Sequence, residues 1–271
     1  SMGQNFLIQS WVPREIAKAS GAGPGTGVLE IGPGIGPLTR ELSLLADRVA
    51  AVELDRSLLP ILAETLADRN NVEIVPGDVM KLDLPALVAE KLPGLRPMVC
   101  ANLPYNITTP VITTFLEAGC FSAITVMIQR EVAQRICAQP GTADYGAFSV
   151  LCQYYAKTEL LFDVGPECFI PAPKVTSSVL RLTLRPAPAE VDDPQHFFHV
   201  VRAAFAQRRK TLVNSLSAAL GSPLSKEELT GAIAACGLPE SVRGERLSLS
   251  DFAALSRELR RAEGNFSAPM E

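Results

Sequence analysis

The sequence lacks any apolar run that approaches the roughly 20 residues of a membrane-spanning helix. Residues 1–10 contain no basic stretch followed by an apolar one, so no signal peptide is expected. Only two histidines are present, His196 and His199, and neither has an acidic or thiol partner at metal-ligand spacing. Because 47% of the 271 residues are hydrophobic, the chain can still bury a large core. We therefore expect a globular protein with no membrane association and no metal ion.

Cys-x-x-Cys pairs are also absent, which argues against a zinc site or a redox pair. Most of the cysteines have apolar neighbours, as Cys100 does between Val99 and Ala101. We expect reduced, buried thiols in a cytoplasmic protein. The six cysteines are Cys100, Cys120, Cys137, Cys152, Cys168 and Cys236.

Short strand-like runs alternate with segments of helical periodicity over the first half of the chain. This alternation predicts an α/β fold with a mostly parallel, Rossmann-like sheet. The predicted strands are 26–31, 48–54, 72–76, 97–101 and 123–128, and the predicted helices are 37–46, 57–68, 109–118 and 129–138.

Two further strands are predicted at 158–164 and 175–184, separated by a proline-rich segment in which no helix fits. They predict an antiparallel end to the sheet. Residues 185–189 have the composition of a linker, and only helical patterns follow. We expect a Rossmann-like domain over 1–185 and a small all-α domain over 186–271. The helices expected in the second domain are 194–206, 210–219, 225–236 and 250–262.

A glycine-rich turn, Gly32-Pro33-Gly34-Ile35-Gly36, follows the first predicted strand. Its spacing is not Gly-x-Gly-x-x-Gly, which weakens a dinucleotide-binding interpretation. Glu53 and Asp78 end the next two strands, where carboxylates can accept the ribose hydroxyls and the amino group of an adenosine. No Lys-Ser or Lys-Thr follows the glycines, which disfavours a nucleoside triphosphate. The pattern favours a neutral or cationic adenosine ligand, among which S-adenosylmethionine is common.

Asn102-Leu103-Pro104-Tyr105 follows the fourth predicted strand and is the most specific signal in the chain. The Asn102 side-chain oxygen and a backbone carbonyl of the rigid turn at Pro104 offer two acceptors for an amino group. Two such acceptors would hold an exocyclic adenine amine with its lone pair free, and Tyr105 would stack on the base. The alternative is a proline turn with a core tyrosine.

Several motifs together resemble the ribosomal RNA adenine N6-dimethyltransferase family. Asn102-Leu103-Pro104-Tyr105-Asn106-Ile107 is similar to its catalytic motif, and the resemblance runs from residue 3 to about residue 255. The other matching segments are 3–7, 28–34, 166–175 and 205–212. The basic stretch that usually precedes Gly3 in this family is missing.

The resemblance implies S-adenosylmethionine as cofactor and S-adenosylhomocysteine as product. It also implies that Phe169 stacks on the second face of the target adenine; the alternative is that Phe169 is a core residue. The implied catalytic residues are Asn102, Leu103, Pro104, Tyr105 and Phe169. The implied cofactor contacts are Gln4, Asn5, Leu7, Gly32, Gly34, Glu53, Leu54, Asp78, Val79 and Asn102.

The formal net charge of −4 excludes a surface that is basic throughout, but a local basic patch can still bind RNA. Cations gather around Phe205 and on the predicted helix 129–138, where phosphate contacts are one interpretation and solvated helix faces the other. The candidate RNA-binding residues are Arg130, Arg135, Arg202, Arg208, Arg209 and Lys210.

From the resemblance we expect a monomer that dimethylates two adjacent adenines in a hairpin loop near the 3′ end of 16S rRNA, with a role in small-subunit maturation. Asn106–Pro110 and the Arg-Arg-Lys-Thr-Leu segment look more like this branch than like its relatives. One alternative is a large-subunit rRNA methyltransferase that confers antibiotic resistance. Another is a ribosome-assembly factor whose methylation is secondary.

Overall fold

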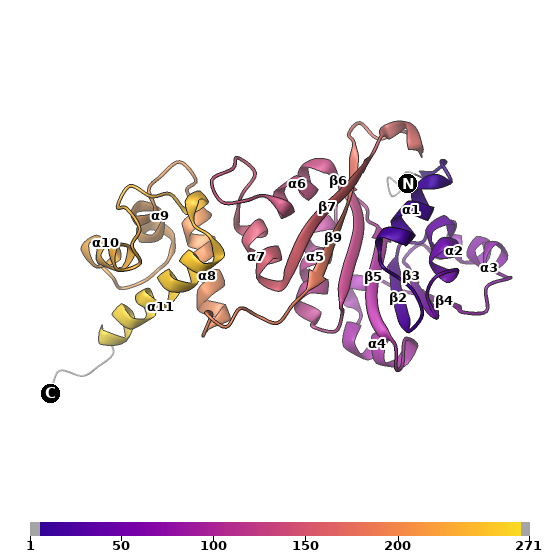
Figure 1. The fold of residues 1–271 in the computed structure, drawn as a ribbon, viewed down its shortest axis with the longest axis horizontal. Helices are drawn as coiled ribbons and strands as arrows, with labels where there is room; N and C mark the ends of the chain where they lie inside the picture. The colour runs from indigo at the N-terminus through magenta and orange to yellow at the C-terminus, as the bar shows by residue number, and fades with distance from the viewer. Residues whose placement is uncertain (1–5, 267–271) are drawn as a thin grey trace. The chain divides into compact units, whose positions relative to one another are not determined.

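The computed structural model describes residues 6–266, and the chain forms two compact units (Figure 1). The first unit contains the chain up to residue 134 together with residues 155–185. The second contains residues 135–154 together with the chain from residue 186 onward. No helix within the described part of the chain is long and apolar enough to cross a membrane.

A seven-stranded sheet organises the first unit, with the strand order β4-β3-β2-β5-β6-β9-β7. The strands β2, β3, β4, β5 and β6 are parallel to one another, and β9 is antiparallel to both β6 and β7. This confirms the predicted mostly parallel sheet with an antiparallel end. The strands are β2 (Thr26–Ile31), β3 (Arg48–Glu53), β4 (Val72–Pro76), β5 (Arg96–Asn102), β6 (Ala123–Gln129), β7 (Ala156–Val164) and β9 (Ser177–Leu184).

Helices cover the sheet, and a cluster of buried side chains packs two of them, α1 and α2, against it. Val12 and Ile16 of α1 and Leu42 of α2 pack in one core with Val28 and Val49 of the central strands. Burial of such side chains contributes about 1.5–3 kcal/mol each to folding. The helices of this part of the chain are α1 (Trp11–Ala19), α2 (Pro37–Ser43), α3 (Leu59–Thr65), α4 (Leu84–Lys91), α5 (Thr108–Ala118) and α6 (Arg130–Cys137).

The strand order reverses between β2 and β5. The chain runs outward from β2 through β3 to β4 and then returns to the other side of β2 as β5. Ile31 is paired with Ala101, so the next residues, Gly32 and Asn102, leave adjacent strands at the same edge. In open α/β sheets such a switch point leaves a crevice between the diverging loops, and ligands bind there.

A small separate sheet lies at this edge. It joins β1 (Phe6–Leu7) to β8 (Phe169–Ile170) in antiparallel register, with Leu7 opposite Phe169. The backbone N–H of Ile8 also donates to the Cys168 carbonyl at 2.9 Å. The beginning of the described chain is therefore fixed to the proline-rich segment that the sequence places between two strands.

The second unit is helical, and the structure differs here from the expected division at residue 185. Residues 135–154 belong to this unit because Tyr145 is buried in it, with its hydroxyl donating to the Leu247 carbonyl at 2.8 Å. The Tyr145 ring also packs edge-on against Phe205. The helices are α7 (Ala147–Tyr155), α8 (Pro194–Phe205), α9 (Leu212–Ala219), α10 (Lys226–Ala235) and α11 (Leu249–Phe266).

We predict that Tyr145→Phe destabilises the helical unit. The change keeps the ring but leaves the Leu247 carbonyl without its buried donor, at a cost of about 1–3 kcal/mol. Chemical denaturation followed by circular dichroism measures this loss. A Tyr145→Phe protein as stable as the wild type would show that this bond does not hold residues 135–154 in the unit.

Candidate active site

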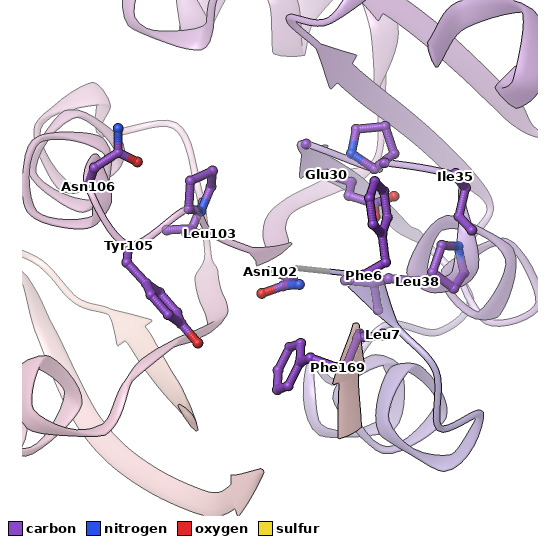
Figure 2. A pocket seen from close by; sticks show the side chains of 15 residues that line it. Phe6, Leu7, Glu30, Ile35, Leu38, Asn102, Leu103, Tyr105, Asn106 and Phe169 are labelled. Carbon is purple, nitrogen blue, oxygen red and sulfur yellow. The ribbon is translucent and has the colours of Figure 1, made fainter. Parts of the chain in front are cut away.

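A cavity of about 300 Å³ lies at the edge of the sheet where β2 and β5 end (Figure 2). Its walls come from three places: the glycine turn after β2, the turn after β5, and the small sheet of β1 and β8. The sequence-predicted residues that line it are Leu7, Gly32, Gly34, Asn102, Leu103, Pro104, Tyr105 and Phe169.

The glycine turn wraps around one side of this cavity. Gly32 and Gly34 have φ values of +65° and +62°, a conformation that other residues rarely adopt. The N–H of Gly34 points back to Glu53 and donates to its Oε2 at 3.2 Å. A side chain at residue 34 would meet the ring of Phe6, whose Cε1 lies 3.8 Å from the position of an added Cβ. Phe6 therefore covers the turn at close range.

Glu53 itself is buried, at 2% exposure, and does not line this cavity. Its Oε1 accepts a hydrogen bond from the Asp55 N–H at 2.8 Å, in addition to the bond from Gly34. Two backbone amides thus fix the carboxylate at the end of β3. A carboxylate has about four acceptor positions, so Glu53 can still accept further donors.

The other residues expected around an adenosine also lie outside the cavity lining. Leu54 is 56% exposed beside Glu53. Asp78 ends the segment after β4 and accepts the N–H of Met80 at 3.0 Å, while Val79 is buried. Gln4 and Asn5 fall outside the residues that the structure describes.

The turn after β5 shows which backbone carbonyl is available as an acceptor. The Pro104 carbonyl accepts from the Ile107 N–H at 3.3 Å and from the Thr108 hydroxyl at 3.1 Å, which uses both of its lone pairs. Within the described residues, no hydrogen bond occupies the Leu103 carbonyl. The free acceptor next to Asn102 is therefore that of Leu103.

Two aromatic side chains face the space around Asn102. Figure 2 shows Tyr105, Asn102 and Phe169 around one cavity, with Tyr105 and Phe169 coming from different elements. Phe169 is 3% exposed and is paired through the backbone with Leu7. The hydroxyls of Tyr105 and Ser177 are hydrogen-bonded at 2.8 Å.

Glu30 is a cavity residue that the sequence reasoning missed. It is 1% exposed, it lines the cavity, and its Oε2 has no hydrogen-bond partner within the described residues. Burial raises the pKa of the Glu30 carboxyl to about 8; Thr39 opposes this shift and the charge of Glu53 adds to it. The available signal was an acid inside a strand whose other residues are apolar or small, because buried acids are rare without a function.

The candidate RNA-binding cations differ in what they contact. Arg130 lies 3.6 Å from Asp163. Arg208 donates to the backbone carbonyls of Ala143 and Tyr145 and lies 3.4 Å from Glu245, so its guanidinium holds the helical unit together. The remaining candidates, Arg135, Arg202, Arg209 and Lys210, have exposed side chains.

The two histidines make ordinary structural contacts. His196 Nδ1 lies 2.7 Å from the Ser256 hydroxyl, and His199 Nε2 lies 2.7 Å from the Leu220 carbonyl. Between residues 6 and 266, no group of three or more His, Cys, Asp or Glu side chains could hold a metal ion. All six cysteines are free thiols.

The mostly parallel seven-stranded sheet with the antiparallel β9 beside β6, and the cavity between the glycine turn and the Asn102 turn, match the Rossmann-like fold of methyltransferases. Solved structures share this fold over nearly the whole chain. A dimethyladenosine transferase from Plasmodium falciparum has a TM-score of 0.79 at 23% identity, covering 95% of this chain and 98% of its own. The 23S rRNA methyltransferase ErmE has a TM-score of 0.72 at 26% identity, covering 94% of this chain and 100% of its own.

The sequence comparisons identify the family. Residues 1–259 match the family described as Ribosomal RNA adenine dimethylase, and the chain belongs to it. Proteins named Ribosomal RNA small subunit methyltransferase A are similar along almost their whole length. The protein of Geobacillus kaustophilus is 47% identical over 96% of this chain and 90% of its own. The protein of Alkaliphilus metalliredigens is 45% identical over 96% of this chain and 91% of its own.

We predict that Glu30 makes the stability of the ligand-free protein depend on pH. Because the pKa is raised from 4.5 to about 8 on folding, the folded state keeps its proton where the unfolded state has lost it. Stability linked to this proton is present below about pH 4.5 and is lost as the pH rises through about 8. Glu30→Gln removes this dependence.

Thermal unfolding of both proteins from about pH 5 to about pH 9 tests this prediction. The melting temperature of Glu30→Gln, relative to the wild type, should increase as the pH rises. The same difference at both ends of the range would show that Glu30 is ionised in the folded protein throughout.

Proposed function

We propose that this protein transfers methyl groups from S-adenosylmethionine to N6 of two adjacent adenines in a hairpin loop near the 3′ end of 16S rRNA, forming N6,N6-dimethyladenosine. The observation that carries this proposal is the position of Asn102. Strand pairing sets it beside the glycine turn, and the two stacking candidates surround the same cavity. The likeness to small-subunit methyltransferases supports the choice of RNA.

Asn102 and Leu103 act on the amino group of the target adenine. The side-chain oxygen of Asn102 and the unoccupied carbonyl of Leu103 accept its two N–H groups. This pairing weakens delocalisation of the nitrogen lone pair into the ring, and it aims the lone pair away from both acceptors. Catalysis then depends on positioning, which can contribute about 7–11 kcal/mol to lowering a barrier.

The cavity fits the cofactor at Glu30. S-adenosylmethionine carries an ammonium group, and its sulfonium supplies an electrophilic methyl group when it is bound. Glu30 presents a buried oxygen without a partner, which is the complement that an ammonium requires. Glycines at residues 32 and 34 leave the backbone open to close approach. Leu7, on β1, contributes an apolar wall.

The adenosine part of the cofactor is assigned to the ends of β3 and β4. Glu53 accepts ribose hydroxyls with the positions that Gly34 and Asp55 leave free. Asp78 accepts the adenine amino group, and its Oδ2 lies only 3.8 Å from the exposed Lys81 ammonium. Leu54 and Val79 flank the ring, and the 56% exposure of Leu54 is the apolar surface that such a ligand would cover.

The target adenine stacks between Tyr105 and Phe169. Stacking of a base on an aromatic side chain contributes about 1–3 kcal/mol and needs an unpaired base. A base inside a duplex cannot reach a cavity of this kind, whereas a hairpin loop presents bases that are already unstacked. The proposed partner is therefore a loop of 16S rRNA within the small ribosomal subunit, which the protein meets in the cytoplasm as a monomer.

The helical unit contributes phosphate contacts. Arg209 and Lys210 lie in the turn between α8 and α9 with exposed side chains, and Arg202 is exposed on α8. Arg130 and Arg135 on α6 add further positive charge. Arg208 fixes this turn through hydrogen bonds to the backbone carbonyls of Ala143 and Tyr145. Contacts of this kind bind RNA without reading its sequence, and salt weakens them.

Methylation of purified ribosomal subunits tests the proposed function. Small and large subunits from cells that lack this activity are incubated separately with labelled S-adenosylmethionine, and rRNA fragments are then weighed by mass spectrometry. We expect two dimethylated adenines in a 3′-terminal fragment of 16S rRNA. Methylation of 23S rRNA instead would favour the large-subunit alternative, and methylation of neither RNA would contradict the proposal.

Substitution of Glu53 and of Tyr105 should separate the two halves of the site. Glu53→Ala removes the ribose acceptor and should weaken S-adenosylmethionine binding by about 10- to 100-fold. Tyr105→Ala removes a stacking surface and should mainly slow methyl transfer. Calorimetric titration with the cofactor and single-turnover assays with small subunits measure the two effects. Unchanged cofactor affinity in Glu53→Ala would refute the ribose assignment.

A further inference from the structure

We propose that Ser177 is a positioning residue for methyl transfer, because its hydroxyl holds the Tyr105 ring in the orientation that receives the target adenine. This inference rests on the proposed function and adds a residue to it. Ser177 does not line the cavity and would not touch cofactor or substrate. Its effect would pass entirely through Tyr105.

The observation is a hydrogen bond between two distant segments. The Tyr105 and Ser177 hydroxyls lie 2.8 Å apart although 72 residues separate them in sequence. Ser177 is 0% exposed. It begins β9 and is paired with Gln129 of β6 on one side and with Val164 of β7 on the other. Pairing with these two neighbouring strands therefore fixes the backbone that carries the Ser177 hydroxyl.

The Tyr105 ring needs such an anchor. Rotation about the Cα–Cβ bond of a partly exposed tyrosine carries the whole ring and its hydroxyl to another staggered position. The Thr108 hydroxyl fixes the backbone near the ring, since it lies 3.1 Å from the Pro104 carbonyl and 3.4 Å from the Tyr105 carbonyl. The bond to Ser177 fixes the opposite end of the side chain. Together they hold the ring at one position against the cavity before any base arrives.

The same bond connects the two walls of the base site. β9 continues directly from the proline-rich segment that carries Phe169 on β8. The Ser177 hydroxyl, at the start of β9, therefore connects the turn after β5, which carries Tyr105, to the strand that follows Phe169 in the chain. We expect the spacing of the two rings to depend on this link.

Other buried serines show what a purely structural role looks like. Ser20, at 2% exposure, donates to the Ala17 carbonyl at 2.6 Å within its own helix end. Ser215, at 0% exposure, donates to the Ala203 carbonyl at 2.8 Å. Their partners are nearby backbone groups, whereas the partner of Ser177 is a side chain that lines the cavity.

A double-mutant cycle on the full-length protein tests the proposal. The variants are Ser177→Ala, Tyr105→Phe and the two combined, with Ser20→Ala as the matched control for loss of a buried serine hydroxyl. Single-turnover methyl transfer to small subunits is measured with cofactor and subunits at saturation. Cofactor affinity and melting temperature are measured for every variant, so that misfolding is separated from misplacement.

We expect Ser177→Ala and Tyr105→Phe each to slow methyl transfer by about 10- to 100-fold, as a misplaced group of this kind does. The combined variant should be no slower than the slower single variant, because both changes remove the same bond. Cofactor affinity should stay within about twofold of the wild type in all of them. Ser20→Ala should lower the melting temperature without changing the rate.

Three results would overturn the inference. The first is a wild-type rate in Ser177→Ala, and the second is rate losses that multiply in the combined variant. The third is a Ser177→Ala protein whose loss of rate is matched by equal loss in Ser20→Ala. A wild-type protein that methylates no rRNA refutes the proposed function and this inference together. Normal methylation by the wild type and by Ser177→Ala refutes this inference alone.

Discussion

The pairing of β2 with β5 is the constraint on which the site depends. Because Ile31 lies opposite Ala101, the chain leaves both strands at one edge, and the loops then diverge. One loop becomes the glycine turn and the other the Asn102 turn, so both turns line one cavity, in which we propose that cofactor and base lie side by side. A shift in this register would separate them. The closeness of the two turns is therefore a consequence of strand order and register.

Charge explains why this crevice suits a cationic adenosine ligand. Glu30 and Glu53 are both buried at the ends of adjacent strands. Burial raises the pKa of Glu30, and the charge of Glu53 raises it further. A bound cation would favour the ionised form of Glu30 and satisfy its unpartnered oxygen. The overall charge of −4 does not oppose RNA binding, because the exposed cations near α8 and α9 act locally.

Much of the first unit could be predicted from the sequence because its signals are local. Strands such as β2 and β5 are short apolar runs that end at or just before a glycine or an asparagine. The order of the strands in the sheet was not predicted. Helix α7 has no clear polar face, and the exposed side of α4 carries Pro85, Ala86 and Ala89, so periodicity did not reveal these two helices. The pairing of β1 with β8 joins residues more than 160 positions apart and has no local signal.

The candidate site shows the same division. Asn102, Tyr105 and Phe169 could be proposed from motifs, and the structure places all three around one cavity. Glu30 and Ser177 could not be assigned from the sequence. The role of Ser177 depends on its hydrogen bond to Tyr105, and that of Glu30 depends on a buried oxygen without a hydrogen-bond partner. The place of residues 135–154 in the helical unit likewise depends on Tyr145 and Leu247, which are 102 positions apart.

The most direct test of the central claim is the single-turnover rate of methyl transfer by Asn102→Ala on small subunits that it still binds. Asn102→Ala should slow methyl transfer at least about 100-fold, because the Leu103 carbonyl cannot hold the adenine amine alone. A rate close to that of the wild type, at the same subunit affinity, would contradict it.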